Sequence, residues 1–160
     1  MKVNDTESYI RQIDIKVLPH QAQRYDTCGD YFKIGSTEYI TVSDMQNEKY
    51  FFLVALHEMI EAFYTRYDGI DEEDILKFDC EYEVERAQHL HLENDEPGDD
   101  PRAPYKKHHT FATQIEREMA ERIHVNWNDY SAAVNSLPLT QTKIDYKPQP
   151  IVYTHDSKGA

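Results

Sequence analysis

Three ionisable residues with the spacing His57-Glu58-x-x-Glu61 lie within an otherwise apolar stretch of the sequence. Residues four apart on a helix lie on the same face, so the side chains of His57 and Glu61 point in the same direction. Imidazole and carboxylate together can bind zinc, iron or manganese. Burying such groups costs free energy unless they are paired, hydrogen-bonded or bound to a metal. The spacing therefore predicts a metal site, with a His–Glu pair at a sheet edge as the alternative.

A metal site needs at least one further ligand, and residues later in the chain are candidates. Asp79 falls in the middle of the apolar face of a second predicted helix, where it is either a ligand or half of a buried salt bridge to Arg24 or Arg86. His109 lies at the start of a third predicted helix, where capping is the alternative role, and its imidazole suits zinc best. We expect a divalent metal, with zinc favoured over iron, manganese and magnesium.

These candidate residues are carried by three predicted helices. Residues 48–67 contain neither Gly nor Pro, and Asp68-Gly69 ends that helix. Asp71 is a predicted N-cap for a second helix that extends to about residue 92. A loop rich in Pro and acidic residues, 93–104, precedes a third helix over residues 108–124. The apolar pattern also predicts that five acids are buried on these helices: Glu58, Glu61, Asp79, Glu83 and Glu116.

The region before these helices has the pattern of a small sheet. Residues 13–17 alternate between apolar and charged side chains, and residues 31–42 form a predicted hairpin around Gly35-Ser36. We therefore predict an α+β fold, with a small N-terminal antiparallel sheet or hairpin followed by three helices. Residues 1–130 are predicted to form a single α+β domain, and residues 131–160 an extended or disordered C-terminal tail.

The composition excludes several kinds of partner. The 160 residues include 30 Asp and Glu against 17 Lys and Arg, which gives a net charge of −13. Such a charge argues against nucleic acid and anionic membranes as partners. The longest apolar stretch, residues 50–56, is much shorter than the ~20 residues of a membrane span. Cys28 and Cys80 are far apart and form no CxxC motif, so we expect a cytoplasmic protein.

The order of a hairpin, a long helix with HExxE and further helices resembles the zincin-like metallopeptidase fold, whose motif is HExxH. That resemblance implies that His57 and Glu61 are ligands and that Glu58 is the general base on a metal-bound water. It also implies a third ligand from further down the chain. Glu61 stands where those peptidases have their second histidine.

The chain also resembles a group of phage and prophage proteins. The resemblance covers roughly residues 10–130, and it rests on residues 24–31, 57–61 and 96–105, the last of which lead into His109. It implies no activity, but it implies the cytoplasm of an infected host as the location.

These observations lead to one favoured function and two alternatives. The favoured function is a metal-dependent hydrolase, with a peptidase as the candidate type, that acts on a peptide or small molecule. Arg24 and Tyr105 are its predicted substrate-binding residues. The first alternative is a magnesium-dependent nucleotide pyrophosphohydrolase with a carboxylate site, because Glu58 and Glu61 form an E-x-x-E pair. The second is a non-enzymatic acidic phage protein that inhibits a host protein or mimics the charge of DNA. The sequence indicates no oligomeric state.

Overall fold

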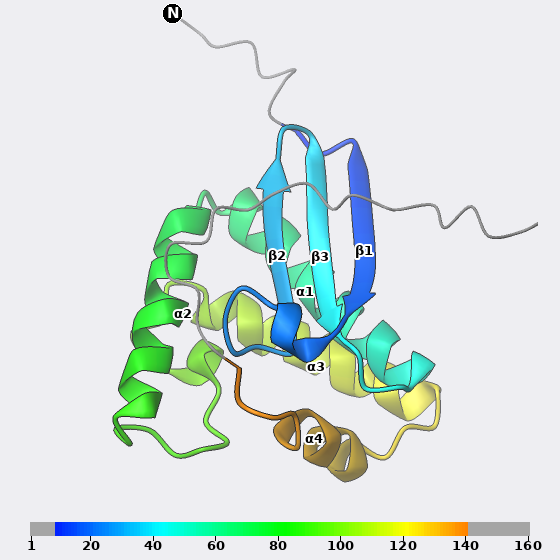
Figure 1. Ribbon diagram of the computed structural model, residues 1–160. Coiled ribbons are helices and arrows are strands. Elements are labelled where there is room, and N and C mark those ends of the chain that lie inside the picture. The colour runs from blue at the N-terminus through cyan, green and yellow to red at the C-terminus, as the bar shows by residue number, and fades with distance from the viewer. Residues whose placement is uncertain (1–8, 141–160) are drawn as a thin grey trace, which may run out of the picture.

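The computed structural model describes residues 9–140, which form a three-stranded sheet and four α-helices (Figure 1). The elements are β1 (Gln12–Leu18), β2 (Gly29–Ile34), β3 (Thr37–Ser43), α1 (Glu48–Tyr67), α2 (Glu72–Ala87), α3 (Lys106–Arg122) and α4 (Trp127–Asn135), with 3-10 turns η2 (His20–Ala22) and η3 (Pro97–Asp99). The α+β prediction is therefore confirmed. In this part of the chain, no helix is both long enough and apolar enough to cross a membrane.

The sheet has the strand order β1-β3-β2 and is mixed rather than wholly antiparallel. Strands β2 and β3 form the predicted antiparallel hairpin, and Gly35 in its turn has a φ of +61°, which glycine adopts without strain. Strand β1 pairs with β3 in parallel, which the prediction of an antiparallel sheet did not include. The difference arises because residues 19–28 carry the chain past the end of β3, so that β2 reaches its far side (Figure 1).

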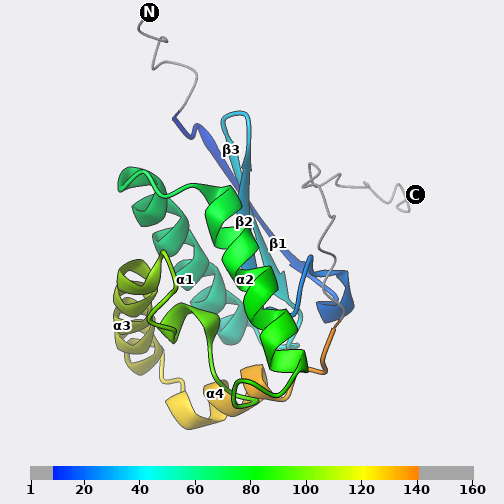
Figure 2. The same ribbon diagram turned by 90° about the vertical axis from the view of Figure 1, so that its left-hand side faces the viewer.

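The main core lies between the sheet and α1. Ile40 and Val42 of β3 are fully buried in the same apolar cluster as Leu53 and Val54 of α1. Figure 2 shows α1 beside the sheet, with α3 on the other side of α1 and α2 in the foreground. The opposite face of the sheet is partly covered by the segment after β1, where Gln23 accepts a hydrogen bond from Thr41 Oγ1. Helix α1 is therefore the central helix, which explains most of its apolar character, although Phe52, Phe63 and Tyr67 on its outer side are exposed.

Helix α1 has the bounds that the sequence predicts, residues 48–67. The side chain of Asn47 caps its first turn by accepting hydrogen bonds from the backbone N–H groups of Lys49 and Tyr50. Gly69, with a φ of +73°, follows its last turn. Both ends are set by residues adjacent in sequence, so this helix could be predicted locally.

Helices α2 and α3 differ from their predicted bounds by a few residues. The predicted N-cap Asp71 is confirmed, but α2 ends at Ala87 rather than near residue 92. The Arg86 guanidinium donates hydrogen bonds to the carbonyl oxygens of Glu93 and Asp95, which turns the chain back. Helix α3 packs against α1 through Ala112 and Ala120, whose small side chains are almost fully buried.

Helix α4 was not predicted. Asn126 caps it, and its Tyr130 is buried in the core, as the apolar character around Trp127 and Tyr130 indicates. The helix continues to Asn135, so regular structure extends past residue 130 into the range predicted to be a tail. Residues 141–160 of that predicted tail lie outside the described residues.

Candidate metal centre

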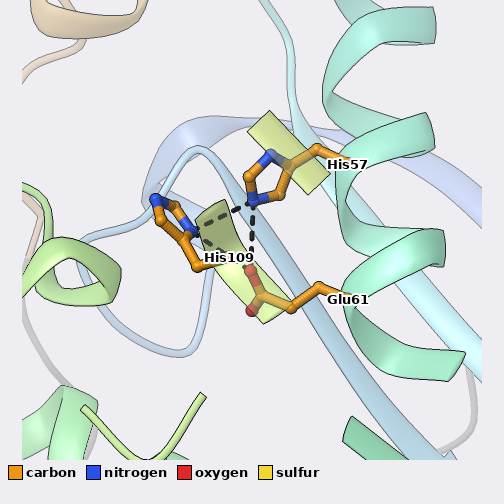
Figure 3. A group of neighbouring side chains, drawn as sticks. All are labelled: His57, Glu61 and His109. Atoms are coloured by element: carbon orange, nitrogen blue, oxygen red, sulfur yellow. Dashed lines mark hydrogen bonds and ion pairs between the residues drawn. The ribbon is translucent and has the colours of Figure 1, made fainter. Parts of the chain in front are cut away.

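His57 and Glu61 of α1 and His109 of α3 each direct one ligand atom toward a common centre (Figure 3). His57 Nε2 lies 3.1 Å from Glu61 Oε2 and 3.2 Å from His109 Nδ1, and the last two atoms are 3.1 Å apart. The helical spacing of four residues brings the first two together, and the packing of α3 on α1 adds the third. All three side chains are buried.

The triangle of donor atoms has the size that a zinc ion requires. In a tetrahedral site with bonds of about 2.0–2.1 Å, two ligand atoms are about 3.3–3.4 Å apart. The three observed distances, 3.1 to 3.2 Å, are close to this value. Two histidines and one carboxylate also form a donor set that occurs in catalytic zinc sites, which keep their fourth position open. The residues therefore fit a catalytic divalent metal in both size and chemistry.

Each of the two histidines also has a carboxylate at its other ring nitrogen. His57 Nδ1 donates a hydrogen bond of 2.8 Å to Glu116, and His109 Nε2 donates one of 3.0 Å to Glu96. Glu116 in turn accepts a hydrogen bond of 2.5 Å from the hydroxyl of Tyr130. Such carboxylates fix the orientation of a metal-binding imidazole and make it a stronger ligand. The outer groups thus support the same assignment as the inner triangle.

Without a metal, these groups form a buried network of ion pairs. Burial by itself would lower the pKa of His57, but hydrogen bonds to Glu116 and Glu61 outweigh it and raise that pKa. For His109 the burial effect is likewise outweighed, by hydrogen bonds to Glu61 and Glu96, and the pKa rises to about 10. For Glu61 burial acts upward, but the two histidines lower its pKa. Binding of a metal would displace the protons from the histidines.

Glu58 lies beside the triangle and differs from the other acids in having no partner. Its side chain is 9% exposed, and within residues 9–140 its carboxyl group forms no hydrogen bond or ion pair. Burial, followed by repulsion from Glu61, raises its pKa well above the usual range. A Cβ on Gly29 would lie only 2.6 Å from Glu58 Oε1, so the start of β2 passes closely over this carboxyl group. A raised pKa makes the ionised form of a carboxyl group a stronger base, which is what a proton acceptor needs.

A cavity of about 730 Å³ opens onto the triangle and is lined by His57, Glu58, Glu61 and His109. This volume suits a small molecule or a few residues of a peptide. The two predicted substrate-binding residues, Arg24 and Tyr105, also line it. The site thus combines candidate ligands, a candidate base and space for a substrate.

The other predicted residues have different local partners. Asp79 lines the cavity but lies outside the cluster of ligand atoms, because it accepts hydrogen bonds from Tyr105 and, at 2.9 Å, from Tyr25. Arg24 does not pair with it, because its Nε and Nη2 donate hydrogen bonds of 2.6 and 2.8 Å to Asp30. Arg86 pairs with Glu83 instead. The five acids predicted to be buried, Glu58, Glu61, Asp79, Glu83 and Glu116, are all buried.

Three supporting residues were not identified as part of the site from the sequence. Glu116 could be placed two turns after His109 on the same helix, but the spacing did not show that it contacts His57. Glu96 lies in an irregular acidic loop, which carries no periodic signal. Gly98 packs its backbone on His109, since a Cβ there would lie 2.3 Å from the imidazole. The proline and glycine of residues 97–98 were the only sequence signal of this loop contact.

No family model, curated protein or solved structure matches this chain. The zincin-like and phage-protein resemblances therefore stay predictions, and the functional argument rests on the geometry of the site.

Proposed function

We propose that this protein is a metal-dependent hydrolase, in which His57, Glu61 and His109 hold one divalent metal ion and zinc is the favoured metal. The observation that carries the proposal is the triangle of donor atoms, with sides of 3.1 to 3.2 Å, on the wall of a cavity. Two helices contribute to it, and each histidine has its own orienting carboxylate. A buried cluster of this kind needs a cation, or protons in its place.

Hydrolysis is favoured because an acid without a partner lies next to the triangle. Glu58 precedes Glu61 by three residues on α1, lines the cavity and forms no ion pair among the described residues. In the proposed mechanism, Glu58 accepts the proton of the attacking water and passes it to the leaving group. The metal, when bound, polarises the water and the carbonyl group of the substrate. The zincin-like resemblance makes a peptide bond the first candidate for cleavage.

The donor set is less compatible with the two alternatives from the sequence. Magnesium prefers oxygen ligands, whereas two of the three donor atoms here are imidazole nitrogens. A mimic of DNA charge uses acids on its surface, so it does not account for the burial of Glu58, Glu61 and Glu116 together. Two histidines and a carboxylate can also hold iron, and metal analysis of the purified protein distinguishes iron from zinc.

The proposal predicts about one zinc ion per chain, measured by elemental analysis after zinc reconstitution and removal of excess metal. The variants His57→Ala, Glu61→Ala and His109→Gln should each lose the metal, because each removes one of three ligands. His108→Gln is the matched control, since His108 is also buried on α3 but bonds to Asp68, outside the cluster. A wild-type protein that takes up no zinc, or a Glu61→Ala variant that keeps it fully, would contradict the proposed site.

The role of Glu58 is tested separately by Glu58→Gln, which keeps the shape of the side chain. We expect this variant to retain zinc but to hydrolyse a library of fluorogenic peptides about 10²- to 10⁴-fold more slowly than wild type. The control is Glu121→Gln, an exposed position on α3. Equal rates for wild type and Glu58→Gln would refute the role of Glu58 as general base.

A further inference from the structure

The cavity beside the candidate metal centre has more negative charge than its own cations neutralise. Its two arginines are both occupied: Arg24 pairs with Asp30, and Arg86 pairs with Glu83 and two backbone carbonyl groups. Two buried carboxyl groups in the wall, those of Glu58 and Asp79, have no cationic partner within residues 9–140. A buried carboxylate without a cation is costly, so a ligand that brings a positive charge would be favoured here.

Asp79 is the better placed of these two acids for binding a substrate side chain. It projects from α2, on a different wall of the cavity from α1, whereas Glu58 lies beside the candidate ligands. The hydroxyls of Tyr25 and Tyr105 hold its carboxyl group in place, one on each oxygen. Each oxygen has a second lone pair, so the carboxylate can accept further hydrogen bonds.

The surroundings of Asp79 suit a guanidinium or an ammonium group. Tyr25, Tyr31 and Tyr105 all line the same cavity, and aromatic rings attract cations through their faces. Burial raises the pKa of Asp79 to about 7, and the negative charges of Glu61 and Asp30 act in the same direction. A cation bound at Asp79 would stabilise its ionised form and lower that pKa. Asp79 is thus a preorganised acid whose charge no residue among the described residues 9–140 compensates with an ion pair.

We propose that the cavity binds an arginine or lysine side chain of a peptide substrate, with the carboxylate of Asp79 as its anionic contact. The inference rests on the proposed hydrolase function and names its substrate class. A carboxylate held by two tyrosine hydroxyls can bind a guanidinium through charge-assisted hydrogen bonds. The volume of about 730 Å³ holds such a side chain together with the peptide backbone next to it.

The test compares two peptides of nearly equal shape, acetyl-Gly-Arg-Gly-amide and its citrulline counterpart, which lacks the charge. Their binding is measured by calorimetry on the full chain, both metal-free and zinc-loaded, with Glu58→Gln as a second background that prevents cleavage. We expect the arginine peptide to bind at least about tenfold more tightly, as charge-assisted contacts allow. A lysine peptide should show the same preference over its norleucine counterpart. Equal affinities for the charged and neutral peptides of wild type would overturn the inference.

Asp79→Asn identifies the contact, because asparagine keeps the size of the side chain and can still bind both tyrosine hydroxyls. In this variant the ratio of the affinities for the arginine and citrulline peptides should fall to about one. Asp74→Asn is the matched control, an exposed position on the same helix, and it should keep the full preference. A preference that persists in folded Asp79→Asn would overturn the role of Asp79. If that variant does not fold, the comparison of peptides on wild type still decides whether the cavity selects cations.

The two proposals fail in different ways. If the protein prefers the arginine peptide to the citrulline peptide but takes up no zinc, the cation site stands and the hydrolase proposal is refuted. If the protein takes up zinc and cleaves the arginine and citrulline peptides equally well, the hydrolase proposal stands and the cation site is refuted.

Discussion

The two candidate ligand histidines have outer carboxylates in different surroundings. Glu116, which bonds His57, is buried and is also held by Tyr130, whereas the side chain of Glu96, which bonds His109, is 56% exposed. An exposed carboxylate is more hydrated than a buried one, so it orients its partner less firmly. Of the two histidines, His57 should therefore depend more strongly on its outer carboxylate.

The difference leads to a prediction for two conservative variants. Glu116→Gln should lower the affinity for zinc by about 10- to 100-fold, the usual effect of losing an outer carboxylate. Glu96→Gln should lower it by less, because that carboxylate is largely solvated. A competition titration against a chelator measures both affinities, and the exposed Glu121→Gln is the control. Equal losses for Glu96→Gln and Glu116→Gln would show that burial does not decide the strength of this support.

Two elements other than the helices of the site also pack against it, and each does so through the backbone of a glycine. Gly29, at the start of β2, passes over Glu58, and Gly98, in the turn η3, lies on the imidazole of His109. Neither position has room for a Cβ, since the nearest side-chain atoms would be 2.6 and 2.3 Å away. The strand and the turn therefore hold two different site residues in position.

Alanine substitutions at these glycines should separate metal binding from catalysis. Gly98→Ala should displace His109 and reduce zinc uptake, because the imidazole is packed directly against the backbone of residue 98. Gly29→Ala should retain zinc but slow peptide hydrolysis, because the added methyl group displaces Glu58 and not a ligand. Elemental analysis and peptide hydrolysis rates measure the two effects. Gly35→Asn, at a turn with open space around it, is the control for folding. The reverse pattern would contradict the assigned roles.

The elements also show which parts of the fold the sequence could predict. Helix α1 was predicted with its observed bounds because its cap, its apolar pattern and its terminal glycine are all local signals. The parallel pairing of β1 and the outer bond from His57 to Glu116 depend on contacts between residues far apart in the sequence. The early end of α2 depends on contacts of Arg86 with an irregular loop, which has no periodic signal. Single-sequence patterns report which face of an element is buried, but they do not report what lies opposite it. For that reason the acids could be predicted to be buried while their partners could not.

For the whole molecule, the net charge of −13 divides into a solvated part and a buried part. The acids at the start of α2 and in the loop after it are mostly exposed, whereas Glu58, Glu61, Asp79 and Glu116 are buried in the wall of the cavity. The buried part sets how stability depends on pH, because desolvation acts most strongly on those groups. Burial raises the pKa values of both Asp79 and Glu38 to about 7, with Arg66 partly opposing the shift at Glu38.

The sign of this effect follows from the direction of the shifts. A carboxyl group whose pKa is higher in the folded state than in the unfolded chain binds protons more tightly when folded, so its contribution to stability is complete at low pH. For Asp79 that contribution is lost as the pH rises from about 4, its usual pKa, to about 7, its pKa in the fold. Ionisation of this group therefore destabilises the metal-free protein at neutral pH.

Asp79→Asn should remove this pH dependence. Between about pH 5 and pH 8, the free energy of unfolding of metal-free wild type should fall relative to that of the variant, by on the order of 2–3 kcal/mol. Urea denaturation at a series of pH values measures the difference. The control is Asp74→Asn, at an exposed position of the same helix, and its free energy of unfolding should change with pH in parallel with that of wild type. Parallel curves for wild type and Asp79→Asn would show that Asp79 has a partner for its charge. The arginine peptide should reduce the loss of stability at high pH in wild type but not in Asp79→Asn, because it supplies the missing cation.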